Sequence, residues 1–252
     1  TEGIGASVVT LSGNVSVADV NVINSKTTGA ITATIAETTM SGLASLTDKT
    51  GSENVYTISV GDLEINADAL VALVDKVAPA SANKVTVSAA NTVTGSFDSI
   101  HKLLTVAAYT TPLSGAADKA YVISDTNLNL DAAKFIAIDT ANDGGTTAVT
   151  ATTITGSLAD VKTLYANANN RFNGTTGFAG TEAVVATEAN VDAADIETIV
   201  GRHSTNTSAV TGKTTGGLTL GTTVTKITGS EVELKHAIES NTPTVQNPVS
   251  NT

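Results

Sequence analysis

The fold is decided by a short sequence, Ile154-Thr155-Gly156-Ser157, that recurs along the chain. Further copies of this Gly-Ser signature are Val93-Thr94-Gly95-Ser96 and Ile227-Thr228-Gly229-Ser230. A second signature, a polar residue after an apolar one, alternates with it at Ser16, Asn66, Asp131 and Asp192. From Asn66 onward the polar residues fall at 66, 96, 131, 157, 192 and 230, in steps of 30, 35, 26, 35 and 38. Such a period is typical of a repeat array, whose units are too small to bury an apolar face alone.

Both signatures have the chemistry of helix N-termini. Ser, Asn and Asp side chains accept hydrogen bonds from the unpaired amides of a first helical turn. In the second signature an apolar residue precedes the cap and another follows it by four positions, as Leu130 and Phe135 do around Asp131. This spacing is a hydrophobic staple, and Ser157 with Asp160 has the spacing of a capping box. We therefore predict short amphipathic helices after each cap, with a degenerate copy at 40–43 whose helix is short or absent.

Segments rich in Val, Ile and Thr separate the predicted helices. They lie at 8–11, 56–60, 84–87, 121–123, 148–152 and 183–186, and their composition is typical of strands. Alternating strands and helices predict an α/β repeat fold, an open solenoid of short strands and short capped helices. A parallel β-helix with helical corners is the alternative.

The repeats predict one array over residues 1–240. Each unit has about 30–35 residues, and units pair into repeats of about 65. Residues 211–223 are interpreted as a loop-like insertion, and residues 241–252 are predicted to be an extended tail or linker.

Composition narrows the class of partner. The 252 residues include 13 Lys and Arg against 24 Asp and Glu, a net charge of −11, with 3% aromatic residues and no cysteine. The acidic balance argues against nucleic acid and anionic membranes as partners. Without cysteine there is neither a disulfide framework nor a thiol site. No apolar run reaches the roughly 18 residues of a membrane-spanning helix, so we expect no membrane insertion.

Few residues suggest chemistry of their own. His101, His203 and His236 are interpreted as surface residues, and Lys213 lacks the upstream glycine of a phosphate-binding loop. Asp125, Asn127 and Asp131 match only the opening of a calcium loop, so a calcium site stays open and an ordinary polar turn is favoured. Asn14, Asn173 and Asn206 begin formal glycosylation sequons. We predict no catalytic residue, no cofactor site and no enzymatic activity.

The two ends of the predicted array are of interest for assembly. The array begins on a strand and stops after a helix, with no amphipathic capping segment at either end. Uncapped ends of a solenoid expose an apolar layer and an unpaired strand edge. Either further repeats of a longer chain cover them, or subunits stack head to tail into an open polymer.

Two segments carry a resemblance to a known class of proteins. Residues 155–165 read Thr-Gly-Ser-x-x-Asp-Val-Lys-x-Leu-Tyr, and residues 190–199 read Asn-Val-Asp-Ala-Ala-Asp-Ile-Glu-Thr-Ile. They resemble repeats of very large secreted bacterial surface proteins, including motility-associated and surface-layer-type proteins of cyanobacteria. The resemblance covers residues 8–240 in repeat style and composition. It implies an extracellular structural or adhesive role, with calcium as a possible support, and assigns no catalytic residue.

Three functions are then ranked. The first is an extracellular, cell-surface structural protein that self-assembles head to tail into a filament or surface layer. The second is a glycan- or surface-binding module of an adhesin or phage fibre, for which the chain offers few aromatic residues, among them Tyr56, Tyr109, Tyr121 and Tyr165. A solenoid enzyme acting on polysaccharide ranks lowest, because the aspartates fall mostly at helix starts.

Overall fold

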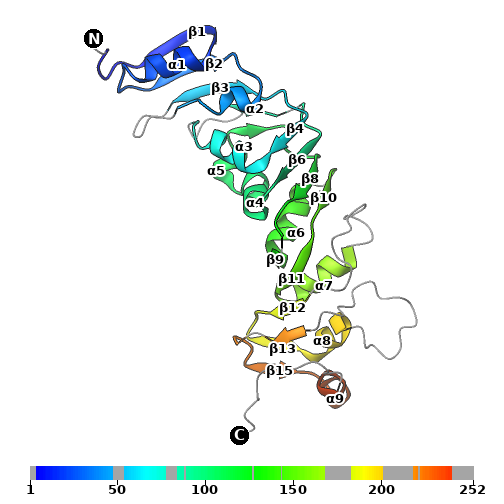
Figure 1. Ribbon diagram of the computed structural model, residues 1–252. Coiled ribbons are helices and arrows are strands. Elements are labelled where there is room, and N and C mark those ends of the chain that lie inside the picture. Colours follow the sequence, from blue (N-terminus) through cyan, green and yellow to red (C-terminus); the bar gives the residue numbers. More distant parts are fainter. Residues whose placement is uncertain are drawn as a thin grey trace. The chain divides into compact units, whose positions relative to one another are not determined.

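A computed structural model describes residues 4–47, 54–77, 84–87, 89–126, 128–142, 144–167, 183–200, 218–220 and 222–239 (Figure 1). The chain forms two compact units, Thr1–Ser124 with Ala141–Gly145, and Asp125–Thr140 with Thr146–Thr252. Residues 211–217 of the predicted insertion and the predicted tail at 241–252 lie outside the described residues. The expectation of one array over residues 1–240 stays a prediction.

The first unit alternates strands with short helices. In chain order its elements are β1 (Val9–Val15), α1 (Val17–Asn24), β2 (Ile31–Ile35), α2 (Met40–Leu43), β3 (Val55–Ser59), β4 (Glu64–Asn66), α3 (Ala67–Val74), β5 (Val85–Thr86), β6 (Thr92–Gly95), α4 (Phe97–Thr105), α5 (Ala107–Thr110), β7 (Leu113–Ser114) and β8 (Ala120–Ile123). We number five repeats: the first is β1 and α1, the second β2 and α2, the third β3, β4 and α3, the fourth β5, β6, α4 and α5, and the fifth β7 and β8.

Strands of successive repeats pair in parallel. One sheet has the order β1-β2-β3-β5-β7, and β4, β6 and β8 are neighbours in another. Ile65 of β4 pairs with Val93 of β6, 28 residues later, and Val93 pairs with Tyr121 of β8 after 28 more. Each strand therefore takes its neighbour from the next repeat, and the connection between them holds a helix in most repeats.

The second unit has the same design. Its elements are β9 (Leu128–Asp131), α6 (Ala132–Ala141), β10 (Thr146–Ala148), β11 (Ala151–Gly156), α7 (Leu158–Asn167), β12 (Ala183–Ala186), β13 (Asn190–Asp192), α8 (Ala193–Val200), β14 (Leu218–Leu220), β15 (Lys226–Thr228) and α9 (Glu231–Glu239). Strands β9, β11, β12 and β14 pair in parallel in that order, and β13 pairs in parallel with β15. The α/β class expected from the sequence is confirmed, with mostly parallel strands in several sheets.

The predicted caps are confirmed at every helix that they were assigned to. Side-chain oxygens accept from a backbone N–H two or three residues on at Ser16, Asn66, Ser96, Asp131, Ser157, Asp192 and Ser230, over 2.9 to 3.3 Å. At Ser230 the box is reciprocal, because the Ser230 N–H donates to the Glu233 carboxylate at 2.6 Å. The degenerate copy is the four-residue helix α2, and its cap is Thr39, whose hydroxyl accepts from the Gly42 N–H.

The cap sequences have a second role that the sequence interpretation missed. Residues just before a cap form strands of their own, such as Glu64–Asn66 before α3 and Thr92–Gly95 before α4. The chain thus leaves a strand and enters a helix almost at once. The single strand predicted at 148–152 is wrong, because this segment holds the end of β10 and the start of β11.

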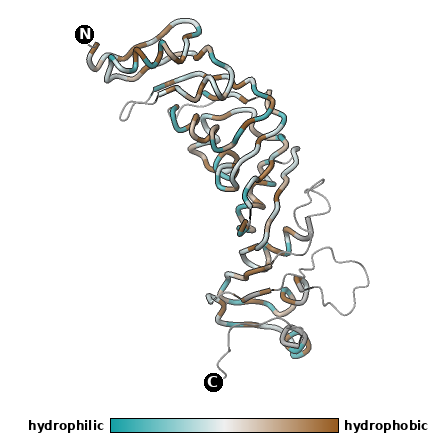
Figure 2. The backbone as a smooth tube through the Cα atoms, viewed as in Figure 1, coloured by the Kyte–Doolittle hydropathy of each residue, from teal (hydrophilic) through white to brown (hydrophobic). Residues whose placement is uncertain are grey.

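The core is a series of thin apolar layers. Positions four and seven after a cap are buried as predicted in α3 (Leu70 and Leu73) and in α6 (Phe135 and Ile138). Strand β2 alternates between buried and exposed residues, with Ile31, Ala33 and Ile35 inside. Figure 2 shows the same distribution, with hydrophobic residues recurring along successive strands and helices. Every repeat therefore contributes a small part of the core.

Candidate functional site

The contact between successive repeats is close where the two signatures meet. A Cβ atom added to Gly95 would lie 2.6 Å from the Cβ of Ala67, and one added to Gly156 would lie 2.9 Å from the Cβ of Ala132. The same holds for Gly229 and Ala193, at 2.8 Å. Real Cβ atoms do not approach so closely, so a residue larger than glycine would push the paired strands apart. The glycine of the Gly-Ser signature is thus matched to the alanine that opens the helix of the preceding signature.

Carboxylates reach back from one repeat to the helix of the repeat before it. The Val17 N–H of α1 donates to both oxygens of Glu37, at 3.0 and 2.9 Å. The Met40 N–H of α2 donates to Asp62 at 2.6 Å, and in the second unit the Leu158 N–H of α7 donates to Glu188 at 2.7 Å. These amides have no acceptor within their own helix. A carboxylate beside a helix N-terminus typically stabilises the fold by about 0.3–1 kcal/mol. Because the carboxylate and the helix belong to different repeats, each of these hydrogen bonds joins two repeats.

A contact in the other direction joins α3 to the cap of α4. The Ser96 hydroxyl donates to Asp68 at 2.5 Å and the Ser96 N–H donates to the same carboxylate at 3.3 Å. Hydrogen bonds from the side chains of Ser96 and Ser99 hold the pKa of Asp68 below its ordinary value of 3.8. In the second unit Lys162 of α7 forms an ion pair with Asp195 of α8. The helices of neighbouring repeats are therefore joined by polar contacts as well as by packing.

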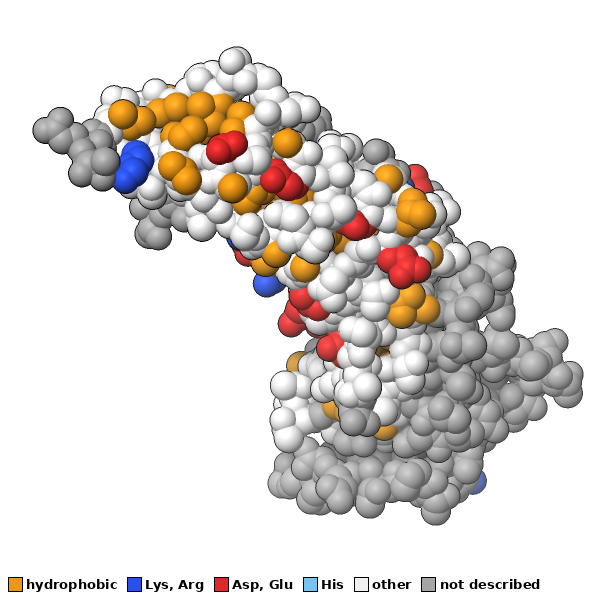
Figure 3. Space-filling model, turned by 45° about the horizontal axis from the view of Figure 1, so that its top comes forward, with side chains coloured by type: hydrophobic (Ala, Val, Ile, Leu, Met, Phe, Trp, Pro, Cys, Tyr) orange, Lys and Arg blue, Asp and Glu red, His pale blue; other side chains and the backbone are white. Residues whose placement is uncertain are grey.

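In the first repeat, apolar strand residues are less buried than the residues at the equivalent positions of the second repeat. Val9 and Val15 of β1 are half-buried, whereas their register partners Ile31 and Ile35 of β2 are buried. Ile4, Val8 and Val22 are exposed to 50%, 71% and 60%. Figure 3 shows hydrophobic side chains gathered over this repeat, at the upper left of the view. Among the described strands β1 has one partner, β2, so its other edge presents unpaired backbone groups.

The residues considered for chemistry do not come together. His101 is half-buried in α4, His236 lies in α9, and His203 and Lys213 lie outside the described residues. Of the calcium candidates, Asn127 also lies outside, while Asp131 accepts from the Lys134 N–H at 3.0 Å as a helix cap. Within the described part of the chain, no group of three or more His, Asp or Glu side chains could hold a metal ion. The sequons at Asn173 and Asn206 are not described, and Asn14 is exposed on β1.

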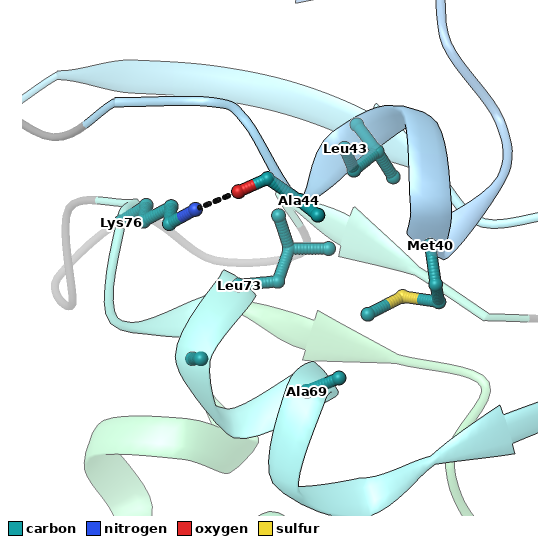
Figure 4. A pocket seen from close by; sticks show the side chains of 7 residues that line it. Met40, Leu43, Ala44, Ala69, Leu73 and Lys76 are labelled. Carbon is teal, nitrogen blue, oxygen red and sulfur yellow. Dashed lines mark hydrogen bonds between the residues drawn. The ribbon is translucent and has the colours of Figure 1, made fainter.

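An apolar hollow of about 140 Å³ lies between α2 and α3 (Figure 4). It exists because α2 has a single turn and leaves part of α3 uncovered. Met40, Leu43 and Leu73 line it, and the Lys76 ammonium at its rim donates to the Ala44 carbonyl at 3.0 Å. The lining presents neither a carboxylate nor a nucleophile, so we interpret the hollow as incomplete packing between two repeats.

The chain matches no protein-family model, and comparisons with curated proteins and with solved structures also find no match. In the part of the chain that the structure describes, no helix has the length and apolar character needed to span a membrane. The site with the most structural support is thus the repeat-to-repeat surface, which lies in the interior of each unit and which no other described strand covers on the first repeat.

Proposed function

We propose that this chain is an extracellular structural repeat protein that self-assembles head to tail into a filament or surface layer. One observation carries the proposal: the surface by which each repeat accepts its neighbour is uncovered on the first repeat. Among the described strands β1 is paired on one edge alone, and Val8 and Val22 of this repeat are exposed. A contact between unlike ends of identical subunits does not close, so it extends into a polymer.

The architecture that we propose for this role is an open solenoid. Support comes from the pairing of each strand with its counterpart in the next repeat, as in β3, β5 and β7. The third repeat holds two strands and one helix, and the fourth holds two strands and two helices, so the proposed solenoid also has the helical corners of the β-helix alternative. Stability in such an array comes from contacts between neighbouring repeats. The end repeat of a second copy of the chain can take the place of such a neighbour.

The complementary end that we propose is formed by α9 and β15. Val232 of α9 is exposed to 61%, and among the described strands β15 has one partner, β13. This segment thus also has an exposed apolar residue and a strand that is paired on one edge among the described strands. We propose that β15 and α9 of one copy cover β1 and α1 of the next.

The extracellular location and the absence of enzymatic activity are parts of the same proposal. They rest on the cysteine-free, acidic composition and on the resemblance to secreted surface repeats. A hydrolase would need a hydroxyl as its nucleophile. The cap hydroxyls accept hydrogen bonds from backbone N–H groups instead, as Ser157 does from the Asp160 N–H. A calcium requirement has no structural support in the described residues.

A glycan-binding adhesin module is the second candidate, and the aromatic residues disfavour it. Sugar sites usually present exposed rings, whereas Tyr56 and Tyr121 are buried and Tyr109 is half-buried. Burial raises the pKa of Tyr121 above its ordinary value, and its hydroxyl donates to the Ala116 carbonyl at 2.7 Å. The rings of Tyr56 and Tyr121 are therefore part of the core.

The proposal is tested by negative-stain electron microscopy and sedimentation velocity of the purified chain, with and without calcium. We expect filaments or lattices from the wild type and dispersed particles from a Val8→Asp/Val22→Asp variant, because two charges in a buried contact oppose association. Leu63→Asp is the matched control, since Leu63 is 59% exposed but lies in the third repeat. Dispersed wild-type particles at all concentrations, or equal assembly of both variants, would refute head-to-tail assembly.

A further inference from the structure

The sheets of this chain follow a rule about the element that comes after each strand. In the five-stranded sheet of the first unit, the first two strands, β1 and β2, are followed by the helices α1 and α2. The later strands β3, β5 and β7 are followed by β4, β6 and β8, which pair in the neighbouring sheet. A sheet therefore begins with two strands that lead into helices and continues with strands that lead into the next sheet.

The second unit follows the same rule. Its four-stranded sheet has the order β9-β11-β12-β14, in which β9 and β11 are followed by the helices α6 and α7. Strands β12 and β14 are followed by β13 and β15, which pair with each other and lead into α8 and α9. Among the described strands this last sheet ends there. It has the two strands that begin a sheet and lacks the strands that continue one.

The first repeat carries the opposite half. Gly5 forms a parallel bridge with Thr27, and the Thr28 N–H donates to the Gly5 carbonyl at 2.7 Å. Residues 4–6 lead into β1 and residues 26–28 lead into β2, so both segments are of the kind that is followed by a strand. No described strand pairs with the other edge of residues 4–6.

We propose that these two incomplete sheets are the halves of one sheet, which forms between two copies of this chain. Strand β15 of one copy lies in parallel beside residues 4–6 of the next copy, and the strand order is β13, β15, residues 4–6, residues 26–28. This order repeats that of β9-β11-β12-β14, with two strands that lead into helices and two segments that lead into strands. The inference rests on the head-to-tail assembly proposed above and names the surfaces that meet in it. Such a contact leaves one copy of each surface at the ends of a dimer, so it extends into a polymer.

The inward-facing residues set the register of this contact. In the complete sheet of the second unit one registered column is fully buried, and it consists of Leu130, Ile154, Val184 and Leu218. The equivalent column of the last sheet holds only Val191 and Ile227, and Ile227 is half-buried.

Gly5 and Thr27 supply the missing half of that column. Thr27 is buried, and a Cβ atom added to Gly5 would meet no atom within 4 Å, so there is space beside this glycine. Ile227 beside Gly5 completes the column in the order Val191, Ile227, Gly5, Thr27. Thr228 then lies beside Ala6.

The same register brings exposed valines of the two copies together. In the second unit the helix after the second strand begins beside the corner after the third strand, because the Leu158 N–H of α7 donates to Glu188. The equivalent helix of the contact is α9, whose Val232 is 61% exposed, and the equivalent corner of the next copy holds Val8, which is 71% exposed. Their contact removes apolar surface from water, which favours association.

The test is an intermolecular disulfide. The chain has no cysteine, so an Ala6→Cys/Thr228→Cys variant holds one thiol on each of the two surfaces. Adjacent strands lie about 4.7–4.9 Å apart, which is within the Cα separation of about 4.4–6.8 Å that a disulfide spans. Mild oxidation of the assembled variant should give a ladder of covalent dimers and larger multimers on a denaturing gel. Ile4→Cys/Lys226→Cys is a second pair on the same two segments and should give the same ladder.

The matched control is Thr57→Cys/Thr228→Cys. Thr57 is exposed like Ala6, but its strand β3 has β2 on one side and β5 on the other, so the control should remain monomeric on the gel. Equal ladders from the control would overturn the pairing, because they would come from collisions between copies. Filaments in the microscope whose two cysteine pairs both stay monomeric after oxidation would refute this contact and leave head-to-tail assembly standing. Dispersed wild-type particles in sedimentation velocity would refute both proposals.

Discussion

The first and the fourth repeats share a design but differ in what covers them. In the fourth repeat β5 has β3 on one side and β7 on the other, and β6 lies between β4 and β8. In the first repeat β1 has β2 alone among the described strands, and its valines are half-buried. Each repeat therefore supplies apolar side chains, but burial depends on the neighbours. The contribution of an apolar side chain to folding stability therefore depends on the repeats on both sides of it.

The largest expected effect comes from truncating a covered helix. Leu70→Ala in α3 removes a buried side chain and should lower the free energy of unfolding by about 2–5 kcal/mol. Val22→Ala in α1 removes a side chain that is 60% exposed, and the change should stay within about 0.5 kcal/mol. Urea unfolding followed by circular dichroism measures both. Equal losses would mean that the first repeat is as well covered as the third.

A smaller effect is expected from the close contact between the two signatures. Gly95→Ala places a Cβ against Ala67 and should cost about 1–3 kcal/mol, as overpacking does. Gly61→Ala is the control, because its nearest neighbour would lie at an ordinary 3.6 Å. Adding Ala67→Gly to Gly95→Ala should recover part of the loss. Thermal melting of these three variants measures this, and a double variant without recovery would contradict the pairing.

The smallest effect concerns Asp68, whose pKa is lowered by the Ser96 and Ser99 hydrogen bonds. A lowered pKa in the folded state stabilises the protein above the ordinary value of 3.8, and this contribution is lost as the pH falls through the lower folded value. Asp68→Asn should therefore lower the melting temperature slightly at pH 7 and hardly at all at pH 2. Ser96→Ala should reduce the effect of Asp68→Asn in a double-mutant cycle. Additive effects would show that the two residues do not interact.

The features of the fold that the sequence predicted depend on residues close together in the chain, such as a helix cap and the apolar positions that follow it. Ser16 and Asn66 were predicted as caps because a cap requires only its own helix, and the apolar positions after Asn66 predicted the buried face of α3. Glu64–Asn66 was missed as a strand because three residues are too few for an alternating pattern. The strand is formed by its pairing with β6 in the next repeat.

Contacts between repeats could not be predicted in the same way. Glu37 and Asp62 have no local signal that assigns them to the helix of the repeat before, 20 and 22 residues away. Their partners become evident only when the parallel register is known. The same applies to Thr34 and Thr57, which become neighbours through strand pairing alone.

The match of Gly95 to Ala67, of Gly156 to Ala132 and of Gly229 to Ala193 has a consequence for how such a gene can change in length. In the second unit, loss of the repeat that carries Gly156 would bring the alanine-bearing helix starts at Ala132 and Ala193 into register, and their Cβ atoms could not both be accommodated. Recombination that removes or adds the repeats two at a time keeps glycine opposite alanine. Where glycine and alanine alternate in this way, the geometry favours duplication of repeats in pairs.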